Sequence, residues 1–317
     1  MTAYEETRQR SGFKNRNTGL AVFGVLQIIL GGLCALAIPS MLFGIIAPAT
    51  LDNRFATPMS ARTAIPGLLF YLLIAMWFIS MGIGSMRARR WARALTLVFS
   101  WIWLITGVIG FVFVGLLMPD MFEQMSRGGQ IPQEIAVIMT YVVMGFMTVI
   151  YIIIPGVFVL FYGSKNVKMT CEFEDPRVRW TDKCPLPVLA LTLIFAFGGF
   201  CMPMMVFYGS VVPVFGRLVD GIPGALILLF IVLTLAFLAW GTYTLKSSAW
   251  WGAFVLSTLG GMSTIVTFLR VSLMEFYERM NFPVQQMEIM QQVSLPSNTS
   301  IAVCTALWLI AFLGYLL

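Results

Sequence analysis

The sequence contains no histidine, and charged residues occupy only 11% of its 317 positions. Without histidine, the chain cannot ligate haem or a metal ion through imidazole, and it cannot use histidine as the base of a hydrolytic triad. Glycine-rich nucleotide-binding loops of the Walker type are also missing. These absences favour a protein that is not an enzyme and that carries no cofactor and no metal ion.

Charge is missing above all from eight long apolar stretches of the chain, none of which contains an Asp, Glu, Lys or Arg. Ion-coupled transporters and proton pumps usually keep an ionisable group near the middle of the membrane, because such a costly charge is retained only for use. Proton coupling through a buried carboxylate is therefore not expected. Polar residues that could line a pathway are also few.

What the sequence has in abundance is apolar residues, at 59% of the chain, where a soluble domain has roughly half. A soluble fold of this length must keep much of its surface polar, so a lipid bilayer is the expected solvent. Each apolar stretch is long enough to span a bilayer, and backbone groups in hydrocarbon must be satisfied internally, which predicts helices. The predicted spans are 20–47, 65–86, 94–117, 135–162, 187–207, 224–245, 253–269 and 300–317. The predicted fold class is an all-α membrane protein with about eight transmembrane helices.

The basic residues predict the orientation of these helices. Arg87, Arg89, Arg90 and Arg93 lie between the second and third spans, and further Lys and Arg lie between the fourth and fifth. The positive-inside rule places these loops and both termini on the cytoplasmic side, where the four arginines can also meet anionic lipid headgroups. No basic stretch is independent of a membrane helix, so nucleic-acid binding is not expected. The expected location is a prokaryotic cytoplasmic membrane.

Matching residues in the two halves predict a tandem duplication. Gly31 and Gly32 of the first span correspond to Gly198 and Gly199 of the fifth. Further matches keep the same order: Ile65-Pro66-Gly67 with Ile222-Pro223-Gly224, and Trp91 with Trp250. Four spans per copy is an even number, so both copies have the same orientation, as parallel repeats do. The predicted domains are a cytoplasmic tail (1–18), a four-helix repeat (19–163), a connecting loop (164–186) and a second four-helix repeat (187–317).

The paired glycines at positions 31, 32, 198 and 199 favour close helix packing, because small residues let helix backbones approach. A helix break that exposes carbonyl groups is the alternative. The first span also carries a Gly-x-x-Gln-x-x-x-Gly pattern at Gly24, Gln27 and Gly31. This pattern occurs in several unrelated four-span families and assigns none of them. Prolines in or near spans are expected to kink them; these are Pro39, Pro155, Pro203 and Pro213.

Two segments that follow the third and seventh spans share acidic, aromatic and Met-rich chemistry. The candidate partner or lipid contacts in them are Met118, Met121, Phe122, Met125, Phe276, Tyr277 and Met280. One interpretation is an amphipathic helix in the outer membrane interface, and another is a docking surface for a partner. A Cu(I) site at Met121 and Met125 has suitable thioether spacing, but no His or Cys lies beside it.

The connecting loop combines Arg, Lys, Asp and Glu with Trp and Pro, which favours an ordered strap over a flexible linker. We expect Arg–carboxylate pairs in it to fix the two repeats, with docking of a cytoplasmic protein as the alternative. Cys171 and Cys184 of this loop make a poor zinc site without further ligands.

Two classes of function remain. The first is a non-enzymatic membrane component: a scaffold or accessory subunit of a membrane complex, or a lipid-binding protein. The alternative is a transporter or facilitator with a pathway between the two repeats, which the parallel duplication and the prolines favour. The expected partners are the lipid bilayer and either another membrane protein or a second copy of the chain.

Overall fold

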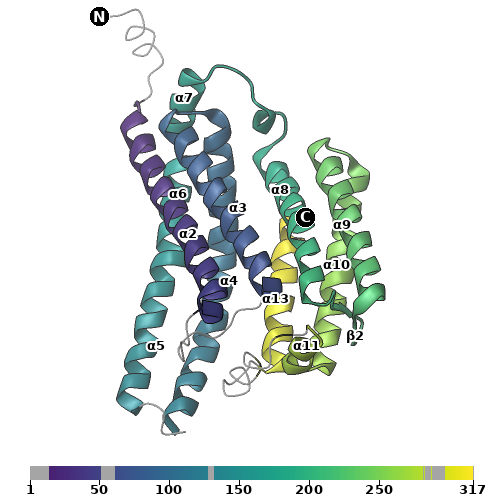
Figure 1. Ribbon diagram of the computed structural model, residues 1–317. Helices are drawn as coiled ribbons and strands as arrows, with labels where there is room; N and C mark the ends of the chain where they lie inside the picture. Colours follow the sequence, from purple (N-terminus) through teal and green to yellow (C-terminus); the bar gives the residue numbers. More distant parts are fainter. Residues whose placement is uncertain are drawn as a thin grey trace, which may run out of the picture. The chain divides into compact units, whose positions relative to one another are not determined.

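A computed structural model describes residues 14–50, 61–127, 132–280, 282, 287 and 297–316. In this part of the chain, eight helices are long and apolar enough to cross a membrane. The protein is therefore an α-helical, multi-pass membrane protein, as predicted. The elements in chain order are α2 (Asn17–Thr50), α3 (Ala61–Met86), α4 (Arg90–Arg127), α5 (Gln133–Thr148), η1 (Val149–Ile153), α6 (Ile154–Gly163), α7 (Lys165–Glu174), η2 (Trp180–Asp182), α8 (Leu186–Cys201), η3 (Met202–Tyr208), β1 (Val212–Val214), β2 (Arg217–Val219), α9 (Gly221–Tyr243), α10 (Ser247–Arg270), α11 (Leu273–Arg279) and α13 (Asn298–Leu316) (Figure 1).

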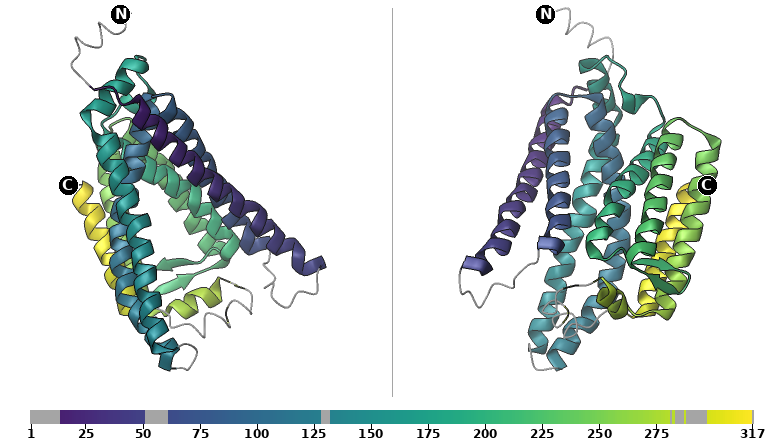
Figure 2. Two further views of the ribbon diagram at one scale, coloured as in Figure 1. Left: turned by 90° about the vertical axis from the view of Figure 1, so that its left-hand side faces the viewer. Right: turned by 45° about the vertical axis from the view of Figure 1, so that its right-hand side comes forward.

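The chain forms two compact units that differ from the predicted repeats. The first unit comprises residues 1–59, 64–103 and 154–189, and the second comprises 60–63, 104–153 and 190–317. In the first unit, α2 and α3 lie side by side and α7 lies near their basic end, which we define by Arg87, Arg89, Arg90 and Arg93 (Figure 2). The predicted domain boundaries at 163 and 187 stay a prediction.

Proline interrupts two of the spanning segments. The fourth segment passes from α5 through a π-helical turn, η1, into α6, and Pro155 lies just after this turn. The fifth changes from α8 to the 3₁₀ helix η3, which contains Pro203. Proline has no N–H to donate within the helix, which explains both irregularities. Pro39 lies inside the unbroken helix α2, and Pro213 lies in strand β1 and not in a span.

A short β-hairpin, which was not predicted from the sequence, follows the fifth span. Strands β1 and β2 pair antiparallel, and Val214 faces Arg217 across a two-residue turn. The turn residues Phe215 and Gly216 have φ angles of 38° and 92°, as a type I′ turn requires. Their backbone N–H groups donate to the hydroxyls of Ser263 and Thr267 on α10, at 2.9 Å each. The hairpin is thereby fixed to the seventh span.

The turns after the second and sixth spans have the same geometry. Ala88 and Leu245, 157 positions apart, both have left-handed φ angles, of 48° and 58°. The next residue in each turn donates its N–H to a glycine carbonyl, Arg89 to Gly84 and Lys246 to Gly241, at 2.9 Å in both cases. The predicted duplication stays a prediction. The offset of 157 positions between these turns would pair Trp91 with Ser248 instead of Trp250.

A buried polar site in the first helical unit

Gln27 is the most deeply buried amide in the membrane-spanning part of the first unit. It lies about three turns into α2, roughly 15 Å from the beginning of that helix. Its exposed fraction is 1%. The amide nitrogen donates a hydrogen bond to Thr96 Oγ1 at 3.2 Å, and the amide oxygen has no partner among the described residues. A buried acceptor without a partner costs about 1–3 kcal/mol.

Glycines bring the helix that carries Gln27 close to α3. A Cβ atom on Gly24 would lie 2.7 Å from the carbonyl oxygen of Gly82, and one on Gly82 would lie 2.6 Å from the carbonyl oxygen of Gly24. A Cβ on Gly31 would lie 2.7 Å from Ile79 Cγ1. Only glycine permits these approaches. The Gly-x-x-Gln-x-x-x-Gly pattern thus places two packing glycines around one buried amide.

The other predicted packing glycines have looser surroundings. A Cβ on Gly32 would meet nothing within 4 Å. Gly198 and Gly199 would each make an ordinary 3.6 Å contact with Leu235. Close helix approach therefore accounts for Gly31 alone among the four.

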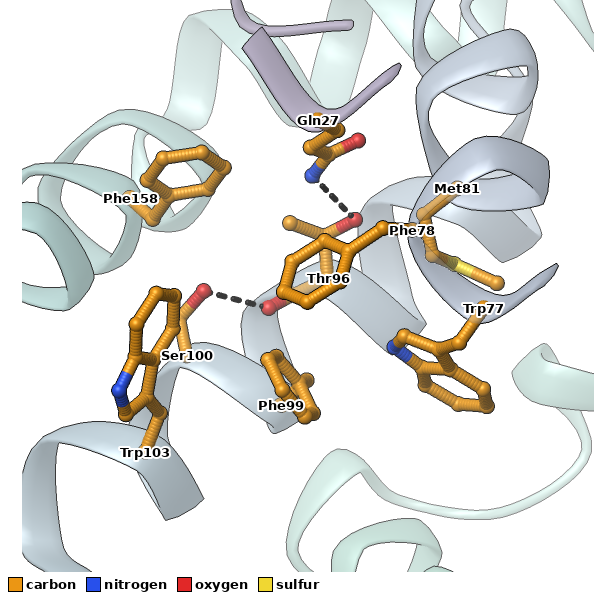
Figure 3. Close-up of a pocket in the computed structure, with 9 residues that line it drawn as sticks. All are labelled: Gln27, Trp77, Phe78, Met81, Thr96, Phe99, Ser100, Trp103 and Phe158. Carbon is orange, nitrogen blue, oxygen red and sulfur yellow. Dashed lines mark hydrogen bonds between the residues drawn. The ribbon is translucent and has the colours of Figure 1, made fainter. Parts of the chain in front are cut away.

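A small cavity lies beside the Gln27 amide. Its lining residues are Gln27, Trp77, Phe78, Met81, Thr96, Phe99, Ser100, Trp103 and Phe158 (Figure 3). The volume of about 10 Å³ suits the centre of a single water-sized group. The polar members Gln27, Thr96 and Ser100 are at most 3% exposed.

Aromatic rings form the less buried part of the lining. Trp77, Phe78, Phe99 and Trp103 are half-buried. The Phe78 and Phe99 rings pack edge to face with centroids 5.4 Å apart, and the Phe99 and Trp103 centroids are 5.8 Å apart. The lining contains no charged residue. A group in this cavity would therefore meet neutral polar atoms and aromatic surface only.

A second polar cluster in the same unit lies nearer the basic end and is fully paired. Tyr162 is 0% exposed, and its hydroxyl lies 2.5 Å from Ser85 Oγ. Ser85 Oγ is also 3.1 Å from the carbonyl oxygen of Leu20, to which it can donate. These bonds tie α2, α3 and α6 together and have a structural role. They contrast with the amide oxygen of Gln27, which is left without a partner.

The second unit has a different polar contact at the position that the predicted duplication pairs with Ser85. Thr242, 157 positions after Ser85, is buried, but its hydroxyl lies 3.1 Å from that of Thr192 on α8, in the fifth span. The residue 157 positions after Thr96 is Ala253, which is fully buried. The glycine match pairs Gln27 with Ile194.

Comparison of the chain with protein-family models, with curated proteins and with solved structures returned no match. The function is accordingly inferred from the residues of this chain. In the described part of the chain, no group of three or more His, Cys, Asp and Glu side chains could hold a metal ion.

The Met-rich segment after the third span continues the helix of that span. Helix α4 runs through Arg127, so the segment is helical as far as that residue, and its location in the outer membrane interface stays a prediction. The side chains of Met118, Met121, Phe122 and Met125 lie outside the described part of the structure. Their predicted contacts, including the Cu(I) alternative, stay a prediction.

The segment after the seventh span packs against the β-hairpin. Met280 is buried at 8% exposure in a cluster with Val211, Leu218 and Val271. Phe276 and Tyr277 are half-buried and pack against the same cluster. A large part of their apolar surface is thus used within the chain. Replacing Phe276 or Tyr277 with serine would therefore disturb packing within the chain, whether or not a partner binds at this segment.

The connecting loop is ordered around one buried carboxylate, that of Asp175, which is 2% exposed. Arg179 donates to it from Nε and Nη2 at 3.1 and 3.0 Å, and Arg89 Nη1 lies 3.6 Å away. Arg90 Nη2 donates to the carbonyl oxygen of Glu172 at 3.2 Å. Burial alone would raise the pKa of Asp175, but the bonds and charges of these arginines outweigh it and hold the pKa below its usual value.

The loop thus contains Arg–carboxylate pairs, but its described polar contacts lie within the first unit, so the predicted role of fixing the two repeats stays a prediction. Asn17 Nδ2 donates to Glu174 Oε1 at 3.0 Å, and the Arg16 backbone N–H donates to Thr170 Oγ1 at 3.2 Å. Of the four predicted topology residues, Arg89 and Arg90 hold the strap, Arg87 is exposed and Arg93 is half-buried. Contact of Arg87 with lipid headgroups stays a prediction.

Proposed function

We propose that this protein is a non-enzymatic membrane component that binds a lipid in the cavity beside Gln27. The observation that carries the proposal is the buried amide oxygen of Gln27, which has no partner among the described residues. A ligand that donates a hydrogen bond would remove the cost of burying that oxygen. We further propose that the basic end and both termini are cytoplasmic, because loops rich in Lys and Arg usually face the cytoplasm.

The surroundings of the site support a lipid as ligand. The cavity lies within spanning helices, and its half-buried lining consists of Trp and Phe rings. Binding pockets for small molecules are mostly apolar and fix orientation through a few placed polar groups. Gln27, Thr96 and Ser100 are such groups in an otherwise apolar lining.

The same residues support a role without catalysis. A nucleophilic hydroxyl needs an adjacent base. The Ser100 hydroxyl donates to the carbonyl oxygen of Thr96 at 2.7 Å, and the neighbouring side chain, Gln27, is a neutral amide. The cavity lining contains neither a carboxylate nor a lysine that could move a proton.

Transport is the second candidate function. It is favoured by the π-helical turn η1 before Pro155 and by the 3₁₀ helix η3 at Pro203. Irregular helices are a feature of transporter binding sites. If a water-filled pathway exists, Cys34 and Cys201, which are half-buried on α2 and α8, should react with aqueous thiol reagents. Lack of reaction would remove this candidate.

Native mass spectrometry of the protein in nanodiscs formed directly from its own membrane tests lipid binding. We expect the wild type to retain one lipid and Gln27→Leu to lose it. This substitution removes the amide oxygen and nitrogen at similar side-chain volume. Thr234→Val is the matched control, because the Thr234 hydroxyl donates to the carbonyl oxygen of Phe230 on its own helix and the residue is not part of the cavity lining.

Each other result has a definite meaning. Equal lipid retention in the wild type and Gln27→Leu would refute the site. A second polypeptide at stoichiometric level, without a lipid, would replace the proposal by an accessory subunit of a complex.

A further inference from the structure

We propose that the lipid bound at Gln27 is a neutral one with a hydroxyl group, and that this hydroxyl donates its hydrogen to the Gln27 amide oxygen. This inference rests on the proposed function and names the chemical class of its ligand. It follows from the hydrogen-bonding capacity that remains open in the site, from the size of the cavity and from the lack of charge in its lining.

The group left open in the site is an acceptor. The Gln27 amide nitrogen already donates to Thr96 Oγ1, and the Ser100 hydroxyl already donates to the Thr96 carbonyl oxygen (Figure 3). The Gln27 amide oxygen has no donor among the described residues. A ligand must therefore present an O–H or N–H. The reverse orientation of the amide would leave an N–H₂ group open and would select a ketone or an ether instead.

The size of the cavity selects a small group. A volume of about 10 Å³ admits the centre of one group the size of water. A hydroxyl meets this limit, and a phosphate or a quaternary ammonium group exceeds it. The rest of the ligand must then lie outside the cavity, along the half-buried rings of Trp77, Phe78, Phe99 and Trp103.

The lining also selects against charge. None of the nine lining residues is ionisable at neutral pH. An ionised carboxylate or ammonium group moved into such surroundings would lose its hydration without gaining a counter-ion. An alcohol loses far less hydration free energy than an ion does, and it regains one hydrogen bond in the site. Water has the same donor chemistry as an alcohol, so the test must separate these two occupants.

Quenching of tryptophan fluorescence by brominated probes separates them. Trp77 and Trp103 line the cavity and are two of nine tryptophans, so the signal to be analysed is the saturable quenching that Gln27→Leu weakens. Nanodiscs holding the full chain receive a brominated long-chain alcohol, its methyl ether or the matching ketone. We expect saturable quenching by the alcohol only, with affinity roughly tenfold weaker in Gln27→Leu and unchanged in Thr234→Val.

Two results would overturn the inference in different ways. If the ether or the ketone quenches as well as the alcohol, the open group is not an acceptor, and the hydroxyl class is wrong while lipid binding stands. If no probe gives quenching that depends on Gln27, the occupant is water, and the proposed function falls together with the inference.

Discussion

Replacing Gly82 with alanine should lower the free energy of unfolding by about 1–3 kcal/mol, the usual cost of overpacking. The new Cβ would lie 2.6 Å from the carbonyl oxygen of Gly24, and backbone cannot move aside as a flexible side chain can. The helices α2 and α3 must then separate, which also moves Gln27 relative to Thr96. Unfolding by steric trapping in bicelles measures the loss.

Gly32→Ala is the matched control for this experiment, because its Cβ would meet nothing within 4 Å. It lies on α2 one residue after Gly31. We expect it to be neutral or slightly stabilising, since alanine has the higher helix propensity. Equal losses in both variants would show that helix propensity or lipid contact, and not the approach of α2 to α3, determines the effect.

Replacing Asp175 with asparagine should release the strap from the basic end. The substitution removes the charge that Arg179 and Arg89 bind, and hydrogen bonds to charged groups contribute about 1.5–3 kcal/mol. The readout is Cys171 in α7, which is 1% exposed and whose pKa is raised by burial to about 12. Its thiol should resist reagents at pH 8 in the wild type and react many times faster in Asp175→Asn.

The depressed pKa of Asp175 predicts a pH dependence of the same contact. A carboxyl group with a lowered pKa in the folded state stabilises fully above its unfolded pKa of about 4. This contribution is lost as the pH falls through the lower, folded value. Hydrogen exchange of residues 164–185 should therefore rise below about pH 4 in the wild type and show no such step in Asp175→Asn. A wild-type strap with constant protection down to pH 2 would contradict this account.

The sequence was enough to predict the spans and their helical form. Apolar runs without a single charge leave few alternatives, because unpaired backbone in hydrocarbon is too costly. The ordered strap was also predictable from its charges. The ion pair that attaches the strap to the basic end could not be predicted. Nothing in the order of residues shows that Asp175 meets Arg89, which lies 86 positions earlier in the chain.

The site was visible in the sequence only as a pattern. Gly24, Gln27 and Gly31 were recognised as a group, but the partner Thr96 lies on another helix, and a tertiary contact of this kind has no local signal. The hairpin was missed because its signal is weak. Val212–Val214 and Arg217–Val219 flank Phe215-Gly216, which is not one of the Asn-Gly or Asp-Gly pairs that predict a hairpin turn.

The Met-rich segments show how amphipathic pattern can mislead. A stripe of Phe276, Tyr277 and Met280 fits a lipid or partner surface as well as it fits internal packing. In the structure it covers the base of the hairpin, where Arg279 Nη1 also donates to the carbonyl oxygen of Leu218 at 3.2 Å. Periodicity identifies an apolar face, but it does not identify what covers that face.

The most direct test of the central claim is a high-resolution cryo-EM map of the wild-type protein in nanodiscs made from its own membrane. We expect an elongated density along Trp77 and Trp103 that ends in a polar group at about 2.7–3.0 Å from the Gln27 amide oxygen. A compact density for a single water, or a donor from the chain itself at that oxygen, would contradict it.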